Sequence, residues 1–217
     1  MEAIDVNDTI LQFQHPFTCI VAGPTKVGKT EWVMKLVNFT EQLISPAIGQ
    51  VIWCYSEWQA KYNTLRKSGN VKFVQGLPDK ETLKKEGPPK LLILDDMMDT
   101  LKDNKQLTEL FIKGCHHWNV SCIHICQSLF YAGLRTLRIN AHYIVLMKSP
   151  SDKLQISMLA RQMFPGLSSE FMQIYQEATA VRYGYLLIDC SAESEDKYRL
   201  RTQIFSNDEY AIFWILN

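Results

Sequence analysis

The residues with the clearest chemical signature lie near the N-terminus, where Gly23 to Thr30 read GPTKVGKT. This segment matches the pattern G-x-x-x-x-G-K-[ST] of a phosphate-binding P-loop. Backbone N–H groups in such a loop face the phosphates, and the helix that follows directs its positive end at the anion. The sequence therefore predicts a nucleotide site formed by Gly23, Pro24, Thr25, Lys26, Val27, Gly28, Lys29 and Thr30.

Each position of the motif predicts a mechanical role. Gly23 and Gly28 let the backbone turn close to the phosphates. Lys29 reaches the β- and γ-phosphates, and the Thr30 hydroxyl binds Mg²⁺. Lys26 has no required role, and we expect its side chain to lie in solvent. A chance match in a glycine-containing turn is the alternative, but the motif stands between an apolar strand and a helical pattern, as the chemistry requires.

Two acidic residues directly follow an apolar strand later in the chain. Leu91 to Leu94 read as a buried strand, and Asp95 and Asp96 come next. A P-loop enzyme needs a carboxylate for Mg²⁺ at the C-terminal end of a neighbouring strand. We expect Asp95 to hold Mg²⁺ through water and Asp96 to polarise the attacking water, which predicts hydrolysis. The alternative is a polar helix cap after a buried strand.

A polar residue ends another apolar strand. Val120 to Cys126 (VSCIHIC) is followed by Gln127 and Ser128. A glutamine at the tip of a strand beside the acidic strand can sense the γ-phosphate and orient water. An ordinary polar loop residue is the alternative.

The elements that must position these residues alternate along the chain. Strands are predicted at 17–22, 50–55, 71–74, 90–94, 120–126 and 141–147, and helices at 30–44, 106–118, 152–163 and 168–179. Segments 185–189 and 198–205 are expected to form an antiparallel pair, and 192–197 an acidic turn. This order predicts an α/β fold with a mostly parallel central sheet and helices on both faces. We expect a single P-loop domain over 1–217, with a core at about 15–205 and an apolar C-terminal tail at 206–217.

Composition and charge narrow the function class. Among the 217 residues, 23 Lys and Arg balance 23 Asp and Glu, so a protein that acts mainly as a polycation on DNA or on membranes is disfavoured. No apolar stretch is long enough to cross a membrane. The segment Met1 to Asp8 carries three acids and no basic residue, which is the wrong charge for a secretory signal.

The cysteines are expected to be free buried thiols. Six of them lie mostly in apolar runs without tight paired spacing, which favours a reducing, intracellular compartment (host nucleus or cytoplasm, or a virion) over secretion. Zinc binding is disfavoured at Cys122, His124 and Cys126, because a buried strand offers neither a fourth ligand nor room for tetrahedral geometry. His116 and His117 are expected at a helix end.

The ordered set of motifs resembles the FtsK–HerA superfamily of P-loop motor ATPases. GPTKVGKT, LLILDD and IHICQS carry this resemblance, followed by AHYIVLMKSPSDK. Within the superfamily, the chain looks most similar to the genome-packaging ATPases of Polinton (Maverick) elements and related double-stranded DNA viruses. That similarity lies in HPFTCIVAGPTKVGKT, NAHYIVLMKSP, LARQMFPG, YGYLLID and YRLRT, within about His15 to Phe205.

The resemblance implies a RecA/FtsK–HerA-like fold and an ATPase that uses ATP and Mg²⁺. It also implies a homo-oligomeric ring that moves double-stranded DNA, independently of sequence, into a capsid with a portal-like vertex protein. Many relatives have small residues where Lys26 and Val27 stand. No appended DNA-tracking domain is evident, so DNA contacts must come from loops of the core.

Ring ATPases complete their sites with a cation from the adjacent subunit. The candidates are Arg135, Arg138, Lys153 and Arg161. Arg138 is preferred because it precedes the strand after Gln127 and could lie at a subunit edge. The alternative for each is an exposed charge on a helix or loop.

Other interpretations remain open from the residues alone. A small P-loop kinase would need an arginine-rich lid, and no compact arginine cluster is present. A nucleotide-dependent interaction protein is the third possibility. A diffuse basic region between Lys61 and Lys90 is either a solvated face or a DNA-contacting loop. Tyr210 to Leu216 is apolar and should be buried, either as an edge strand or short helix on the chain's own core or, with Trp214 as anchor, on another subunit or a capsid protein.

Overall fold

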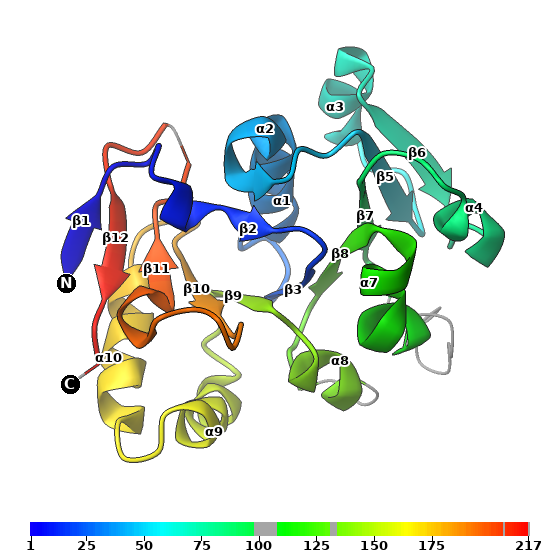
Figure 1. Ribbon diagram of the computed structural model, residues 1–217. Helices are drawn as coiled ribbons and strands as arrows, with labels where there is room; N and C mark the ends of the chain where they lie inside the picture. The colour runs from blue at the N-terminus through cyan, green and yellow to red at the C-terminus, as the bar shows by residue number, and fades with distance from the viewer. Residues whose placement is uncertain (98–107, 131–133, 206, 217) are drawn as a thin grey trace.

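The computed structural model describes residues 1–97, 108–130, 134–205 and 207–216. In the described part of the chain, a ten-stranded sheet runs through the molecule in the order β1-β12-β11-β10-β9-β3-β8-β7-β5-β6 (Figure 1). The strands from β9 to β6 are all parallel. They are β9 (Tyr143–Met147), β3 (Thr18–Ala22), β8 (Val120–Cys126), β7 (Lys90–Asp95), β5 (Gln50–Tyr55) and β6 (Val71–Gln75).

The other end of the sheet is antiparallel. It contains β10 (Tyr185–Asp189), β11 (Leu200–Thr202), β12 (Ala211–Trp214) and β1 (Glu2–Ile4). The predicted antiparallel pair is confirmed, because β10 lies antiparallel to β11, although β11 is shorter than the predicted strand at 198–205. A separate small sheet joins β2 (Phe13–Gln14) and β4 (Ile44–Ser45) in parallel.

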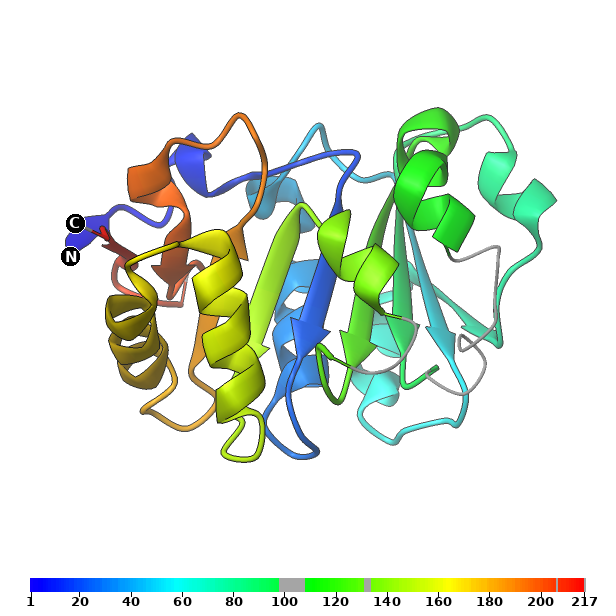
Figure 2. The ribbon, with the colours of Figure 1, turned by 90° about the horizontal axis from the view of Figure 1, so that it is seen from below.

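Helices cover both faces of the sheet, as predicted (Figure 2). One face carries α1 (Lys29–Asn38), α2 (Thr40–Leu43) and α3 (Tyr62–Ser68). The other carries α4 (Lys80–Lys84), α7 (Cys115–Trp118), α8 (Arg135–Ile139), α9 (Lys153–Met163) and α10 (Ser168–Ala178). Short 3-10 turns occur at η1 (Thr9–Leu11) and η3 (Asp196–Tyr198), and the second overlaps the end of the acidic turn predicted at 192–197.

Two predicted helices differ from the structure in detail. The pattern at 30–44 is divided into α1 and α2, and Ile44 belongs to β4. The helix predicted at 106–118 is helical from Thr108, with a π-helical segment η2 (Leu110–Gly114) before α7, and its residues 106 and 107 lie outside the described residues. Each helix buries only one side, so packing against the sheet, rather than the full length of the apolar pattern, decides where it ends.

Alternate residues of the central strands enter two separate cores. Cys19 and Val21 of β3 belong to the core under α1, whereas Ile20 and Ala22 belong to the core under α9 and α10. This alternation is the strand geometry that a sheet covered on both faces requires. No helix within the described ranges is long and apolar enough to span a membrane.

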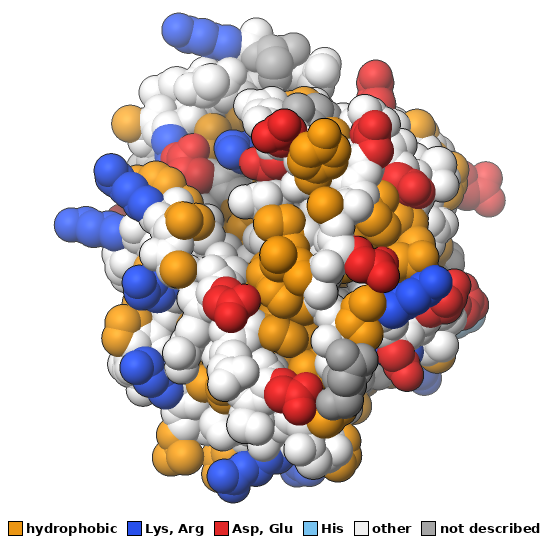
Figure 3. Space-filling model, turned by 90° about the vertical axis from the view of Figure 1, so that its left-hand side faces the viewer, with side chains coloured by type: hydrophobic (Ala, Val, Ile, Leu, Met, Phe, Trp, Pro, Cys, Tyr) orange, Lys and Arg blue, Asp and Glu red, His pale blue; other side chains and the backbone are white. Residues whose placement is uncertain are grey.

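The apolar C-terminal segment forms part of the sheet. β12 pairs with β11 on one side and with β1 on the other. Trp214 is only 7% exposed, which favours burial on the chain's own core over the alternative in which this side chain anchors another protein. The segment is buried on the chain's own core, but as an internal strand rather than an edge strand. Figure 3 shows the side of the molecule on which β1 and β12 lie. Hydrophobic side chains gather in the middle of this side, with acidic side chains around them.

Candidate nucleotide-binding site

The P-loop connects the C-terminal end of β3 to the N-terminus of α1. Two of its residues have left-handed backbone angles, Lys26 with φ 67° and Gly28 with φ 101°. A Cβ at Gly23 would lie 2.7 Å from Cβ of Met147, and one at Gly28 would lie 2.7 Å from Cδ1 of Tyr183. Glycine is therefore required at both ends of the loop by close packing as well as by the turn.

Lys29 lies folded over the loop. Its Nζ donates hydrogen bonds to the carbonyl oxygens of Gly23, at 2.7 Å, and Pro24, at 2.8 Å. Burial lowers the pKa of this ammonium group from its ordinary value, while Asp95 and Asp96 oppose that shift. The ammonium is thus held inside the curve of the loop, where the phosphates of a nucleotide bind in proteins of this type.

The acidic strand lies one strand away from the P-loop strand. We expected Asp95 at the end of a strand next to the P-loop strand, but β8 stands between β3 and β7. The carboxylate is nevertheless close to the loop, because the Thr30 hydroxyl donates to Oδ1 of Asp95 at 3.5 Å. A carboxylate and a hydroxyl at this spacing suit Mg²⁺, which prefers oxygen ligands and keeps several waters.

Asp95 is buried and held by a tyrosine. The Tyr62 hydroxyl, from α3, donates to Oδ2 of Asp95 at 2.8 Å, and both residues are buried. Desolvation raises the pKa of Asp95 above its ordinary value, and the hydrogen bond from Tyr62 and the charge of Lys61 act in the opposite direction. The carboxylate therefore has a fixed orientation and a cation nearby.

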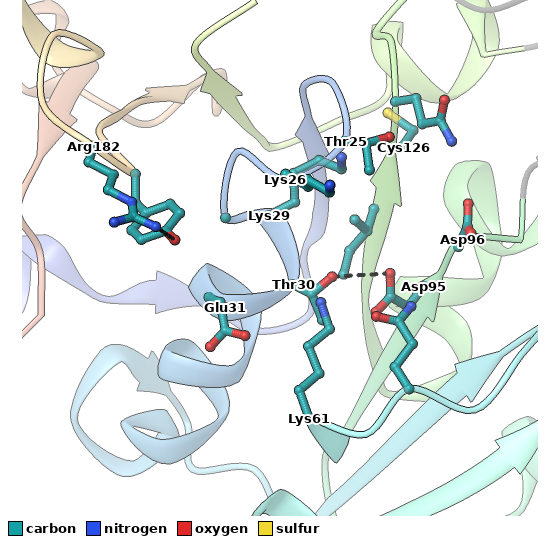
Figure 4. A pocket seen from close by; sticks show the side chains of 15 residues that line it. Thr25, Lys26, Lys29, Thr30, Glu31, Lys61, Asp95, Asp96, Cys126 and Arg182 are labelled. Carbon is teal, nitrogen blue, oxygen red and sulfur yellow. Dashed lines mark hydrogen bonds between the residues drawn. The ribbon is translucent and has the colours of Figure 1, made fainter. Parts of the chain in front are cut away.

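Asp96 differs from Asp95 in its exposure to solvent and in its backbone conformation. It is exposed, its backbone has a left-handed φ of 53°, and its carbonyl accepts a hydrogen bond from the Ser56 hydroxyl at 3.0 Å. Its carboxylate lies beside the cavity next to the P-loop (Figure 4). One acid is thus buried against Thr30 and the other is accessible to a water molecule.

Gln127 follows the strand that separates the P-loop from the acidic strand. The carbonyl of Cys126 accepts a hydrogen bond from the Gly23 N–H at 3.3 Å, so the end of β8 is tied to the start of the loop. Gln127 lines the same cavity as Lys29 and Asp96. Its predicted place beside the acidic strand is the one observed, because β8 pairs with β7.

A single cavity of about 450 Å³ brings these groups together. The predicted residues that line it are Thr25, Lys26, Gly28, Lys29, Thr30, Asp95, Asp96 and Gln127. Lys26 is exposed, as expected. Gly23, Pro24 and Val27 belong to the same loop, although they do not line the cavity among the described residues.

Seven lining residues were not singled out as site residues from the sequence. They are Glu31, Gln59, Lys61, Ile125, Cys126, Arg182 and Tyr183. Lys61 was noticed only within the diffuse basic region, and Tyr183 only within the YGYLLID segment. Lys61 lies in the loop after β5, and Arg182 lies in the loop before β10. Position beside a strand end is therefore the sequence signal that could have found these two cations.

The candidate trans cations lie away from this cavity. Arg135, Lys153 and Arg161 are exposed, and the guanidinium of Arg138 lies over the Phe130 ring, 4.4 Å from its centre. The helix α8 leads to Asn140, whose carbonyl accepts a hydrogen bond from Thr18 at the start of β3. Arg138 therefore lies toward the end of the strands opposite the P-loop, away from the cavity of its own chain.

The cysteine and histidine residues of β8 are enclosed by protein. Cys122, His124 and Cys126 are all buried, and desolvation lowers the pKa of His124 to about 4. Burial raises the pKa of Cys126 to about 12. All six cysteines are free, five of them buried and Cys190 partly so, in agreement with the expected thiols.

A comparison with models of protein families shows which family this chain belongs to. The family model described as Poxvirus A32 protein matches residues 47–212, which include Asp95, Asp96 and Gln127 and begin after the P-loop. A comparison with curated proteins found no match.

Solved structures share the fold at low sequence identity. The DNA-packaging ATPase B204 from Sulfolobus turreted icosahedral virus is 14% identical with a TM-score of 0.55, and the match covers 94% of this chain and 100% of that one. The genome packaging NTPase B204 from Sulfolobus turreted icosahedral virus 2, in complex with ATP-gammaS, is 15% identical with a TM-score of 0.54, covering 82% and 95%. The cytoplasmic domain of the Type VII secretion ATPase EccC from Thermomonospora curvata is 16% identical with a TM-score of 0.55, covering 85% of this chain and 25% of that one. These matches confirm the α/β P-loop NTPase fold.

Proposed function

Because the chain belongs to the poxvirus A32 protein family, we propose that it is an ATP-hydrolysing motor that translocates double-stranded DNA into a viral or virus-like capsid. The observation that carries this proposal is the meeting of Lys29, Thr30, Asp95, Asp96 and Gln127 at one cavity beside the P-loop. The fold likeness to a DNA-packaging ATPase supports it. The finer likeness to Polinton packaging ATPases stays a prediction.

The residues divide the hydrolytic work between them. Lys29 leaves the carbonyls of Gly23 and Pro24 and neutralises charge on the β- and γ-phosphates. Thr30 and Asp95 would hold Mg²⁺, which when bound neutralises charge that develops on the phosphate oxygens. Asp96, which is exposed to the cavity, orients the attacking water and accepts its proton.

Two further groups complete the proposed site. Gln127, at the end of β8, senses the γ-phosphate from the strand between the P-loop and the acidic strand. A cation from the neighbouring subunit stabilises transition-state charge, and Arg138 is our first candidate. Arg138 lies toward the end of the strands opposite its own P-loop, which is compatible with a role in trans in a homo-oligomeric ring.

DNA is the partner that this motor would move, and its contacts would be with phosphates. Among the basic residues between Lys61 and Lys90, the exposed ones at one end of the sheet include Arg66 and Lys67 of α3, Lys72 of β6 and Lys84 of α4, whereas Lys90 is buried. Such contacts predict binding that is independent of sequence and weakened by salt. A capsid or portal-like vertex protein is the second proposed partner.

The proposal is tested by the ATPase rate of the purified chain with and without double-stranded DNA, at low and at high salt. We expect DNA to stimulate hydrolysis at low salt and the stimulation to fall as salt rises. The Lys29→Ala variant is the control for contaminating ATPases. Hydrolysis that DNA does not change at either salt concentration would contradict the motor assignment. Transfer of the phosphoryl group to a small acceptor would favour a kinase.

A further inference from the structure

A second cavity adjoins the P-loop cavity on the side away from Asp95 and Asp96. It has a volume of about 330 Å³ and shares Gly28, Glu31, Arg182 and Tyr183 with the first cavity. In Figure 4, Arg182 lies on one side of the P-loop and Asp95 and Asp96 lie on the other. The acids mark the end of the site where the metal and the γ-phosphate belong. A nucleotide laid along the loop therefore extends its nucleoside toward Arg182 and the second cavity.

The walls of the second cavity suit a flat aromatic group. Trp32 from α1, Tyr185 from β10 and Phe205 line it, and all three side chains are buried. The Trp32 ring is 5.6 Å from that of Tyr185 and 5.7 Å from that of Phe205. Charged side chains, Glu31, Lys35 and Asp208 among them, line other parts of the cavity, so the aromatic rings form an apolar wall with polar groups beside it.

Tyr183 stands where the two cavities meet. Its ring packs against Gly28, and its backbone has a left-handed φ of 63°. Its hydroxyl accepts a hydrogen bond of 2.9 Å from Arg182, whose guanidinium lies 4.8 Å from the centre of the ring. The side chain is still 51% exposed, so one side of a fixed aromatic ring remains available for stacking.

Trp214 forms part of the wall of the same cavity. Its side chain is only 7% exposed and lines the cavity. Its indole Nε1 is enclosed by protein, so the residue contributes an aromatic surface to the wall rather than a donor for the ligand.

We propose that this second cavity binds the nucleobase of the nucleotide, with Tyr183 stacked on the base and the Trp214 side chain forming part of the wall that encloses it. The inference rests on the proposed ATP site and names the part of the chain that recognises the base. It also assigns the C-terminal strand β12 to the nucleotide site, because Trp214 is its last residue.

The test separates base recognition from phosphate recognition. Binding of Mg²⁺–ATP and of Mg²⁺–tripolyphosphate, which has no base, is measured by calorimetry on the full chain and on Tyr183→Ala and Trp214→Phe. Tyr210→Ala is the matched control, because Tyr210 is also 51% exposed but lines neither cavity. Thermal unfolding of each variant shows whether it is folded, and Tyr183→Phe, which keeps the stacking ring, should bind ATP more tightly than Tyr183→Ala.

We expect Tyr183→Ala and Trp214→Phe each to weaken ATP binding by about fivefold or more and to leave tripolyphosphate binding within about twofold of wild type. Tyr210→Ala should match wild type with both ligands. ATP binding by wild type that neither cavity variant weakens would overturn the base site alone. Equal weakening of ATP and tripolyphosphate would also overturn it, since the residues would then act on the phosphates or the fold. A wild-type chain that binds neither ligand would overturn the proposed function as well.

Discussion

The Tyr62 hydroxyl donates a hydrogen bond of 2.8 Å to the carboxylate of Asp95, and both side chains are buried beneath the P-loop cavity. Burial and the neighbouring charge of Asp95 raise the pKa of Tyr62, so the hydroxyl keeps its proton and remains a donor. The second oxygen of the carboxylate accepts from Thr30. Tyr62 is therefore a positioning residue for the acid that we assign to Mg²⁺.

Removing this hydroxyl should change the pH dependence of hydrolysis. The hydrogen bond favours the ionised form of Asp95, so Tyr62→Phe should raise the pKa of that carboxyl still further. The acid limb of the ATPase profile should then move to higher pH by about one unit. Tyr143→Phe is the control, because the Tyr143 hydroxyl accepts from the Gln14 N–H at the end of the strands opposite the P-loop. A profile unchanged from wild type would show that Asp95 does not limit activity at low pH.

Replacing Asp95 itself should separate stability from activity. Its folded pKa is raised, so the folded chain holds this proton more tightly than the unfolded chain. The penalty for burying the charge is present at neutral pH and is relieved as the pH falls through the folded pKa. Asp95→Asn should therefore raise the melting temperature at neutral pH by a few degrees (about 2–4 °C per kcal/mol) while Mg²⁺-dependent hydrolysis is lost. The difference in melting temperature should shrink in acid, and a variant less stable than wild type at neutral pH would refute this reading.

Asp96→Asn should give a different phenotype. The variant keeps the size of the side chain but loses its charge and its ability to accept a proton. We expect Mg²⁺–ATP binding close to wild type and hydrolysis slowed by about a hundredfold or more. Calorimetry and single-turnover rates measure the two quantities. If Asp95→Asn binds normally and is slow, while Asp96→Asn hydrolyses normally, the two roles are exchanged.

The local motifs could be predicted from the sequence because each is formed by neighbouring residues. The P-loop lies between a strand and a helix, and Asp95, Asp96 and Gln127 stand at strand ends, where parallel strands gather their functional residues. Chain order does not determine sheet order, so the place of β8 between β3 and β7 was not foreseen. Burial of 210–216 was expected because the window is apolar, and its pairing with residues 2–4 was not, since that register joins the two ends of the chain.

The missed site residues depend on tertiary structure. Lys61 and Tyr62 reach Asp95 from the start of α3, and their position after β5 is the one sequence feature that could have indicated them. Arg182 and Tyr183 reach the P-loop because β10 runs antiparallel to β9, which brings the start of β10 to the end of the sheet that holds Gly28. An arginine–tyrosine pair in a loop has too many ordinary uses to indicate a site by itself.

Deleting residues 208–217 should destabilise the monomer. The deletion removes β12, exposes the pairing edge of β11 and leaves β1 without a partner strand. It also removes the buried side chains of Phe213 and Trp214. We expect a lower melting temperature by several degrees or more, since losing one large buried aromatic costs about 3–5 kcal/mol. An unchanged melting temperature with lost oligomerisation would instead place the segment at a subunit interface.

The central claim, that ATP hydrolysis at this site moves double-stranded DNA, is tested most directly by displacement of a labelled third strand from a DNA triplex. The full chain is mixed with the triplex, and release of the third strand is followed after ATP and Mg²⁺ are added. We expect release that requires ATP, falls at high salt and is absent in Lys29→Ala and Asp96→Asn. DNA-stimulated ATPase activity with no release of the third strand from any duplex length would contradict translocation.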